Sequence, residues 1–218
     1  MSEQHGLAKH STATISDALD KLGRPGSLHG LAPLFDGARL CGRAFTVRYV
    51  PAGSPPGTVG DYLDDVEPGQ VVVLDNAGRT DATVWGDILT AMAHDRKVAG
   101  TVIDGVCRDV ERALGEGYPI FSRGRFMRTG KDRVEVDEVG GSVSIGGVKV
   151  RAGDLVVGDA DGAVVVAREI EDEVLAICDG IAAREAAILA DVLSGVGIAE
   201  ARRRHGYHLL QRHEEDVS

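Results

Sequence analysis

The sequence lacks an excess of basic residues: 24 Lys and Arg stand against 34 Asp and Glu, which gives a formal net charge of -10. Nucleic-acid binding depends on clustered cations that displace counterions from phosphates, so this balance argues against that class of function. The one basic run, Arg202 to Arg204, adjoins acidic residues in a stretch with helical character, and we interpret it as a solvated helix face. We therefore expect no nucleic-acid partner.

Long apolar runs and an apolar leader are also lacking. The longest apolar runs, such as VVVL at 71–74 and AVVVA at 163–167, are far shorter than the roughly 20 residues that a membrane span needs. The N-terminal MSEQHGLAKH is polar, and the three cysteines are odd in number and widely spaced. These absences predict no membrane association and suit a protein of the reduced cytoplasm.

Apolar residues are present in sufficient number for one substantial core, since they make up 43% of the 218 residues. A chain of this length favours one large domain over two small ones, so we expect a single domain over residues 1–218. Low-complexity tracts and internal repeats are absent from the sequence.

The first half of the sequence has the pattern of an α/β protein. STATISDALDKLG, from Ser11 to Gly23, has the apolar spacing and the end signals of a helix. A glycine-rich loop over 24–43 and a strand over 44–50 follow. Strands at 71–75, 100–104 and 119–122 then alternate with helices at 87–96 and 109–114. This alternation predicts parallel βαβ units.

The second half is predicted to add hairpins and long helices. Short apolar runs after Arg128 are separated by Gly-Gly and Asp-Gly turn signals, which are typical of β-hairpins. Amphipathic spacing predicts a long helix over 168–193 and a final helix over 198–212. The predicted fold class is therefore α/β, with a layered mixed β core and flanking helices.

The stretch WGDILTAMAHDRKVAGTVIDGVCRD, residues 85–109, carries polar pairs at both ends. Gly86-Asp87 precede the helix after the strand at 71–75, and Arg108-Asp109 follow the strand at 100–104, so a right-handed βαβ unit brings the four residues together. Gly86 would let a ligand approach the backbone, and the N–H groups of Asp87, Ile88 and Leu89 favour an anion. The structural alternative is an ordinary helix start at Asp87 and an exposed Arg108–Asp109 ion pair.

The two pairs, with twenty residues between them, resemble the signature of the 4-hydroxy-4-methyl-2-oxoglutarate aldolase family. That family belongs to the larger group that includes regulator of ribonuclease activity A. STATISDALDKLG near the start and RAGDLVVGDADGAVVV at 151–166 extend the resemblance over most of the chain. The resemblance implies a fold of the swivelling phosphohistidine-domain type and homotrimers, or hexamers built from two trimers.

The resemblance also implies a class II, metal-dependent pyruvate aldolase that cleaves 4-hydroxy-2-oxo diacids and often decarboxylates oxaloacetate. Cleavage beside a 2-oxo acid leaves a pyruvate enolate, whose charge a divalent cation and a guanidinium can stabilise. In this family pattern Asp109 is the metal ligand, Arg108 holds the keto acid and its enolate, and Asp87 orients a metal-bound water as the base. Backbone N–H groups from Gly86 to Leu89 take the carboxylate. The expected metal is Mg²⁺, with Mn²⁺ and Co²⁺ left open.

Two assignments keep alternatives beside them. In the resembling aldolases, an acidic residue of a neighbouring subunit's C-terminal helix approaches the metal, and Glu185 is the candidate here. An exposed helical Glu is the simpler interpretation of Glu185. The alternative function is a non-enzymatic regulator that binds a protein partner, but the typical regulator lacks the metal-binding acid, so Asp109 favours the enzyme. The leaving fragment, and whether aldol cleavage or decarboxylation dominates, stay open.

Weaker motifs are better explained by structure than by chemistry. Asp159 and Asp161 in GDADG lack the rest of a calcium-loop pattern, so Asp161-Gly162 is interpreted as a hairpin turn. No complete dinucleotide or P-loop motif is present. Cys107 adjoins the proposed site, but no His lies near it in the sequence, so we expect a packed thiol rather than a nucleophile.

Overall fold

The computed structural model describes residues 5–207 of the 218-residue chain. Within this range the α-helices are α1 (Thr12–Lys21), α2 (Asp87–Asp95), α3 (Val110–Glu116), α4 (Glu171–Leu193) and α5 (Ile198–Arg204). The strands are β1 (Ala32–Pro33), β2 (Leu40–Pro51), β3 (Val71–Thr83), β4 (Gly100–Cys107), β5 (Ile120–Arg125), β6 (Val134–Val139), β7 (Val143–Ile145), β8 (Val148–Val150), β9 (Leu155–Asp159) and β10 (Gly162–Val166). Short 3₁₀ helices are η1 (Gly6–Lys9), η2 (Asp61–Asp65) and η3 (Arg168–Ile170).

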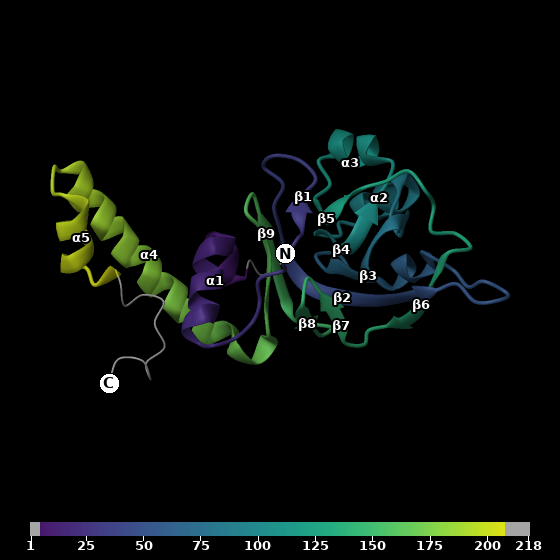
Figure 1. The fold of residues 1–218 in the computed structure, drawn as a ribbon, viewed down its shortest axis with the longest axis horizontal. Coiled ribbons are helices and arrows are strands. Elements are labelled where there is room, and N and C mark those ends of the chain that lie inside the picture. Colours follow the sequence, from purple (N-terminus) through teal and green to yellow (C-terminus); the bar gives the residue numbers. More distant parts are fainter. Residues whose placement is uncertain (1–4, 208–218) are drawn as a thin grey trace.

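One mixed sheet organises the molecule (Figure 1). Its strand order is β1-β5-β4-β3-β2-β9-β10, with β6 paired to β2, and β7 and β8 form a separate hairpin. Strands β2, β3, β4 and β5 are parallel neighbours, whereas the pairings to β1, β6, β9 and β10 are antiparallel. The α/β class with a mixed β core and flanking helices is therefore confirmed.

The central strands bury both of their faces, as parallel strands usually do. Along β3, Val72 and Leu74 belong to a core cluster that includes Ala93 of α2 and Ala113 of α3. The alternate residues Val71 and Val73 belong to a second cluster with the β7–β8 hairpin. This period-two alternation explains how one apolar run supports two layers, with α2 and α3 on one face of the sheet.

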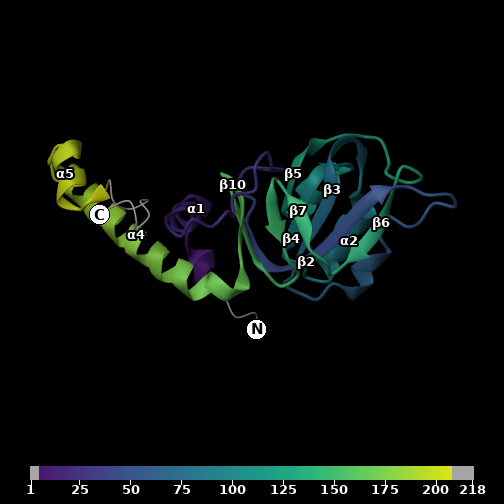
Figure 2. The same cartoon turned by 60° about the horizontal axis from the view of Figure 1, so that its bottom comes forward.

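A third cluster lies where α1 and α4 pack on β9 and β10. Ile15 and Leu19 of α1 meet Val174 and Cys178 of α4 there. Beyond this contact α4 projects away from the sheet as an arm, and α5 lies against its far end (Figures 1 and 2). We call the far part of α4 together with α5, residues 185–204, the C-terminal arm. Among the described residues, no helix is both long and apolar enough to cross a membrane.

The predicted elements are present, with corrected boundaries. The final helix was expected to reach 212, but α5 ends at Arg204, and 208–212 lie outside the described residues. The loop predicted over 24–43 contains β1, and β2 begins at Leu40 rather than at 44. Strand β3 continues past a bulge to Thr83 instead of ending at 75. Hairpins β7–β8 and β9–β10 form at the predicted turn signals.

Candidate active site

Two loops meet at the carboxyl edge of β3 and β4, as the βαβ pattern predicts. Thr83, the last residue of β3, pairs with Val106 of β4, which ends one residue later. The chain therefore leaves both parallel strands at the same edge of the sheet. The Arg108 N–H donates to the Trp85 carbonyl oxygen at 3.0 Å, which ties the second loop to the first. Helix α2 then begins at Asp87 and helix α3 at Val110.

Gly86 lies against both members of the second pair. A methyl group built at Gly86 would be 2.8 Å from Asp109 Oδ2 and 3.4 Å from Arg108 Nε. The first distance is shorter than real Cβ contacts, so any side chain at position 86 would push the Asp109 carboxylate aside. Gly86 therefore lies close to Arg108 and Asp109, and its extended backbone does not itself require a glycine.

The charged pair at this edge stays accessible to solvent. Arg108 Nε lies 3.1 Å from Asp109 Oδ2, and the two side chains are 39% and 42% exposed. Ion pairs this exposed contribute little to stability, typically about 0.2–1 kcal/mol. Asp109 also adopts a left-handed backbone conformation, with φ of 54° and ψ of 39°, which Asp and Asn tolerate better than most residues. The pair is thus better suited to binding a ligand than to holding the fold.

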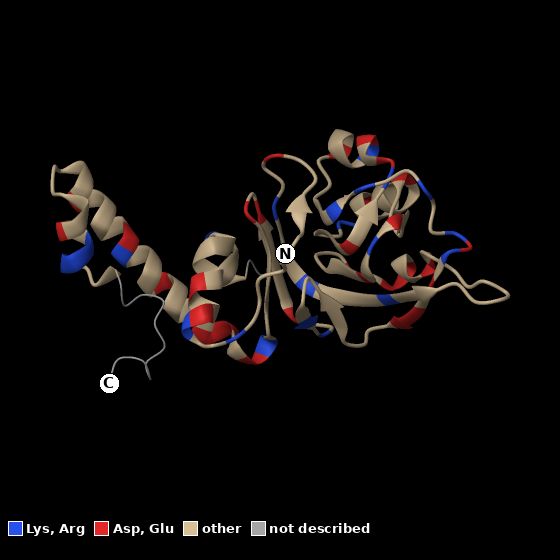
Figure 3. Ribbon diagram, viewed as in Figure 1, with Lys and Arg blue, Asp and Glu red and all other residues tan. Residues whose placement is uncertain are grey.

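A hollow of about 740 Å³ opens between the start of α2 and the length of α3. Its lining residues are Asp87, Asp109, Glu111, Arg112, Gly115 and Glu116. Four carboxylates thus line the hollow with one guanidinium, that of Arg112, which pairs with Glu116 at 2.9 Å, and acidic positions occur on both helices (Figure 3). Arg108 is not among the lining residues. Carboxylate oxygens are the hard donors that Mg²⁺ prefers, so the donor chemistry of this hollow fits a divalent cation.

The number of possible protein ligands is small. Among residues 5–207, no group of three or more His, Cys, Asp or Glu side chains is arranged to hold a metal ion. Mg²⁺ commonly keeps several waters and takes one or two carboxylates of a protein. Asp109 is the ligand that the family resemblance implies, and it lines the hollow.

The backbone at the start of α2 differs from the simple expectation of three free N–H groups. The Ile88 N–H donates to Asp87 Oδ1 at 2.8 Å, so a ligand carboxylate would have to displace the Asp87 side chain to reach it. In the described part of the chain, the N–H groups of Asp87 and Leu89 have no acceptor. Ile88 is 77% exposed, whereas the Leu89 side chain packs against the core.

Glu185 does not join these residues within one chain. It is exposed on α4. The C-terminal arm lies at the opposite end of the molecule from α2 in both views, and from α3 in Figure 1 (Figures 1 and 2). The structure thus brings together Gly86, Asp87, Arg108 and Asp109 but leaves Glu185 apart. A contribution from Glu185 would need a second copy of the chain.

Sequence reasoning missed the side chains beneath this edge. The Trp85 indole Nε1 donates to Thr90 Oγ1 at 2.9 Å, and Thr90 Oγ1 donates to the Gly86 carbonyl oxygen at 2.9 Å. Both residues are buried. The available signal was that Thr90 follows Gly86 by four residues, the spacing at which a helical hydroxyl reaches back to a carbonyl. Glu111 and Glu116 in the hollow were also not predicted.

The weaker motifs have the structural roles that were expected. Asp161-Gly162 lie at the turn of the β9–β10 hairpin. Cys107 is fully buried, and burial raises the pKa of its thiol. Arg203 and Arg204 pair with Glu200 on the exposed surface of α5.

Comparison with known proteins identifies the family. The family model described as "RraA-like: Aldolase/RraA" matches residues 12–165. A 4-hydroxy-4-methyl-2-oxoglutarate aldolase, provisionally so named, from Halalkalibacterium halodurans is 35% identical over 164 residues, which are 75% of this chain and 76% of that protein. Protein DlpA of Legionella pneumophila is 36% identical over 204 residues, which are 92% of this chain. The match spans only 33% of the length of DlpA.

A solved structure extends the comparison to the fold. RraAS2 of Streptomyces coelicolor, described as an unusual member of the RNase ES inhibitor RraA protein family, superposes with a TM-score of 0.72 at 32% identity. The superposition covers 78% of this chain and 86% of RraAS2. The chain therefore belongs to the RraA-like family, whose members include proteins named as aldolases and proteins named as ribonuclease inhibitors.

Proposed function

We propose that this protein is a divalent-metal-dependent aldolase that cleaves 4-hydroxy-2-oxo acids, such as 4-hydroxy-4-methyl-2-oxoglutarate, to pyruvate and a carbonyl product. Decarboxylation of oxaloacetate is the proposed second activity, because it passes through the same pyruvate enolate. The observation that carries the proposal is the placement of Gly86 close to the Arg108–Asp109 pair, beside an acidic hollow. The aldolase name of a relative 35% identical to this chain supports it.

Arg108 is the residue that we assign to the keto acid. Its guanidinium is permanently charged, planar and 39% exposed, so it can bond a carboxylate and a keto oxygen in two places. Charge develops on that keto oxygen as the carbon–carbon bond breaks. A cation already held at the site stabilises this charge without reorganisation during the reaction.

Asp109 is the residue that we assign to the metal, with Mg²⁺ as the first candidate. A bound divalent cation supplies Lewis-acid stabilisation of the developing negative charge. Asp109 lines the hollow, and its Oδ2 lies 3.1 Å from Nε of Arg108, the guanidinium that we assign to the keto acid.

Asp87 is the residue that we assign to proton transfer. Retro-aldol cleavage requires removal of the proton on the substrate's 4-hydroxyl group, and a carboxylate can accept it directly or through one water. Asp87 is exposed, lines the hollow and begins α2. Decarboxylation of oxaloacetate has no hydroxyl proton to remove, so Asp87 should matter less for that activity.

The C-terminal arm supports a proposal on assembly. Three apolar side chains are exposed there, Leu189 (57%), Leu193 (78%) and Ile198 (53%). Exposed apolar side chains that lie together on a surface commonly mark a contact with another protein. We propose a homotrimer, or a hexamer of two trimers, in which the arm of one copy brings Glu185 toward the site of another. Light scattering should give at least three subunits. A fully active monomer would contradict a site shared between copies.

The experiment that tests the function is a substrate panel. Pyruvate release is followed from several 4-hydroxy-2-oxo acids and from oxaloacetate, with Mg²⁺ or Mn²⁺ and with excess chelator. We expect release with the metals, no release in chelator and recovery when the metal is restored. Undiminished turnover in chelator would exclude the metal role. A folded protein that releases no pyruvate from any substrate would favour the regulator that the likeness to RraAS2 suggests.

A further inference from the structure

We propose that Thr90 is a positioning residue, whose hydroxyl holds the Gly86 peptide in the place where Asp109 and a substrate carboxylate meet it. Thr90 does not touch the hollow and is 1% exposed. It acts through Gly86 on one side and through Trp85 on the other. The inference rests on the proposed function for its kinetic consequences, but its structural content can be measured separately.

The direction of each hydrogen bond follows from the chemistry of the groups. An indole N–H can only donate, so Thr90 Oγ1 accepts from Trp85 Nε1 at 2.9 Å. A hydroxyl carries a single hydrogen, which is then free for the Gly86 carbonyl oxygen at 2.9 Å. The Thr90 N–H donates to the same carbonyl at 3.0 Å. One buried side chain therefore joins the indole to the first carbonyl of α2.

Gly86 needs such a restraint because it has no side chain of its own. Glycine has more backbone freedom than any other residue, yet the Gly86 backbone lies close to the side chains of Asp109 and Arg108. The proposed site needs it to stay in that position. Its backbone is extended, with φ of −145° and ψ of −163°, immediately before the helix. The two hydrogen bonds to its carbonyl fix the orientation of the peptide that joins Gly86 to Asp87.

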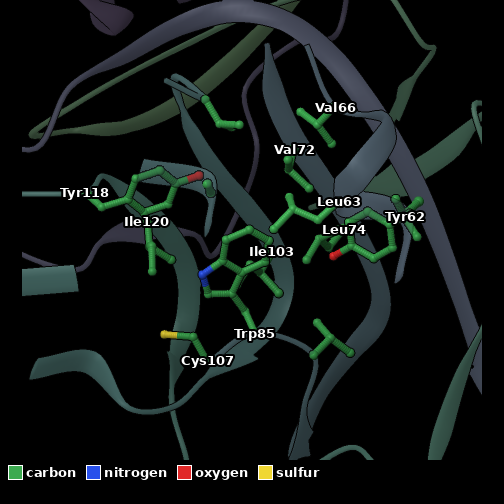
Figure 4. Close-up of a cluster of buried hydrophobic side chains, with 14 of the residues drawn as sticks. Tyr62, Leu63, Val66, Val72, Leu74, Trp85, Ile103, Cys107, Tyr118 and Ile120 are labelled. Carbon is green, nitrogen blue, oxygen red and sulfur yellow. The ribbon is translucent and has the colours of Figure 1, made fainter. Parts of the chain in front are cut away.

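Trp85 links this restraint to the core and to the second loop. Its indole is 2% exposed and stacks on Tyr118, with ring centroids 6.2 Å apart and planes 5° apart. Figure 4 shows the indole among Ile103, Ile120 and Tyr118, with Cys107 nearby. The Trp85 carbonyl accepts the Arg108 N–H at 3.0 Å. The same tryptophan thus holds Thr90 through its side chain and Arg108 through its backbone.

A threonine inside a helix often bonds back to the carbonyl four residues earlier without any functional role. The indole donor distinguishes Thr90, because removing the hydroxyl leaves a buried N–H unpaired and also frees the Gly86 carbonyl from one of its donors. A purely structural role would lower stability alone. A positioning role also loosens residues 86–89 and slows turnover in the folded protein.

The test compares Thr90→Val, which removes the hydroxyl, with Thr90→Ser, which keeps it. The matched control is Thr46→Val. Thr46 lies on β2, is fully buried, and donates its hydroxyl hydrogen to the Gly141 carbonyl oxygen at 2.7 Å. Trp85→Phe removes the indole donor from the other side and serves as a second variant if Thr90→Val folds poorly.

Hydrogen–deuterium exchange supplies a readout that does not depend on activity. The hydrogen-bonded amides of Thr90, which donates to the Gly86 carbonyl, and Arg108, which donates to the Trp85 carbonyl, should lose protection from exchange in Thr90→Val relative to wild type. Both amides should keep wild-type protection in Thr46→Val. The emission of Trp85, the single tryptophan, should shift in Thr90→Val alone. Unchanged protection of the Thr90 and Arg108 amides in Thr90→Val would overturn the proposal, whether or not the protein is an aldolase.

Kinetics supply the second readout. A displacement of about 1 Å can cost about 100-fold in rate, so kcat for pyruvate release should fall by about 10- to 100-fold in Thr90→Val. It should stay within about 3-fold of wild type in Thr90→Ser and in Thr46→Val. An active wild type with an equally active, folded Thr90→Val would refute positioning, whereas an inactive wild type would refute the proposed function instead.

Discussion

Asp159 ends a strand and Asp109 closely follows one, yet the surroundings of the two carboxylates differ. Asp159, the last residue of β9, is 6% exposed. Its carboxylate accepts from the Thr12 N–H at 2.8 Å, the Thr12 hydroxyl at 2.6 Å and the Asp161 N–H at 3.0 Å. Asp109, two residues beyond β4, has a side chain that is 42% exposed and contacts Arg108 Nε at 3.1 Å.

The comparison separates a carboxylate that holds the fold from one that is available for a ligand. Three donors occupy the acceptor sites of Asp159 and tie the start of α1 to the β9–β10 hairpin. Asp109 keeps most of its acceptor capacity and faces a hollow that contains three further carboxylates. Removing the first charge should therefore reduce stability, and removing the second should reduce activity.

The largest effect is expected at Asp109. Asp109→Asn keeps the shape and suits the left-handed backbone, which Ala would tolerate less well. The loss of a metal ligand should lower pyruvate release by about 1,000-fold or more, because metal stabilisation of the enolate is worth several kcal/mol. Thermal unfolding should stay close to wild type. An unfolded or strongly destabilised Asp109→Asn would support the structural interpretation of the Arg108–Asp109 pair.

The next effect is expected at Arg108. Arg108→Lys keeps the charge but removes the planar fork, so substrate affinity should survive in part while kcat falls about 100- to 1,000-fold, or about 2.7–4 kcal/mol. Steady-state kinetics with 4-hydroxy-4-methyl-2-oxoglutarate measure both quantities. If exchange of pyruvate methyl protons keeps its wild-type rate while cleavage collapses, Arg108 serves the departing fragment rather than the enolate.

A smaller effect, on stability rather than on activity, is expected at Asp159. Asp159→Asn converts a charged acceptor of three hydrogen bonds into a neutral amide, and it should destabilise the fold by about 1–3 kcal/mol. Urea unfolding measures this change, and kcat per folded molecule should match wild type. A loss of activity in the folded Asp159→Asn protein would remove the distinction between the two carboxylates.

The smallest effect concerns pH. Burial alone would raise the pKa of Asp159, but hydrogen bonds from the Thr12 hydroxyl, the Thr12 N–H and the Asp161 N–H lower that pKa below its ordinary value. The stabilisation is therefore present above the unfolded-state pKa of about 3.9 and is lost as pH falls through the lower folded-state pKa. Thr12→Val should lose about 1–2 kcal/mol at neutral pH, and less at low pH. A difference between Thr12→Val and wild type that stays constant down to pH 2 would contradict the assignment.

Local sequence signals predicted the elements that form the candidate site. The apolar runs at 71–75 and 100–104 and the helices after them are local patterns, so their parallel pairing and the placement of Gly86 close to Asp109 followed from βαβ geometry. The hairpins at Gly146-Gly147 and Asp161-Gly162 were predicted for the same reason.

The features that were missed depend on contacts between distant residues. The bulge at Asn76 to Gly78 has the local sequence of a turn, yet β3 resumes beyond it because β4 continues to pair there. Strand β2 begins at Leu40 because β9, more than a hundred residues later, pairs with it. The Trp85–Thr90 contact depends on how the indole enters the core, which no periodic pattern encodes.

The exchange of pyruvate methyl protons with deuterated solvent tests the central claim most directly, because it requires enolate formation by removal of a methyl proton and no carbon–carbon bond cleavage. With Mg²⁺, the wild-type protein should accelerate the exchange, and both chelator and Asp109→Asn should abolish it, whereas Asp159→Asn should preserve it. A folded wild-type protein that leaves the exchange at the uncatalysed rate, or an Asp109→Asn variant that exchanges as fast as wild type, would contradict the assignment of a pyruvate-enolate site to this edge of the sheet.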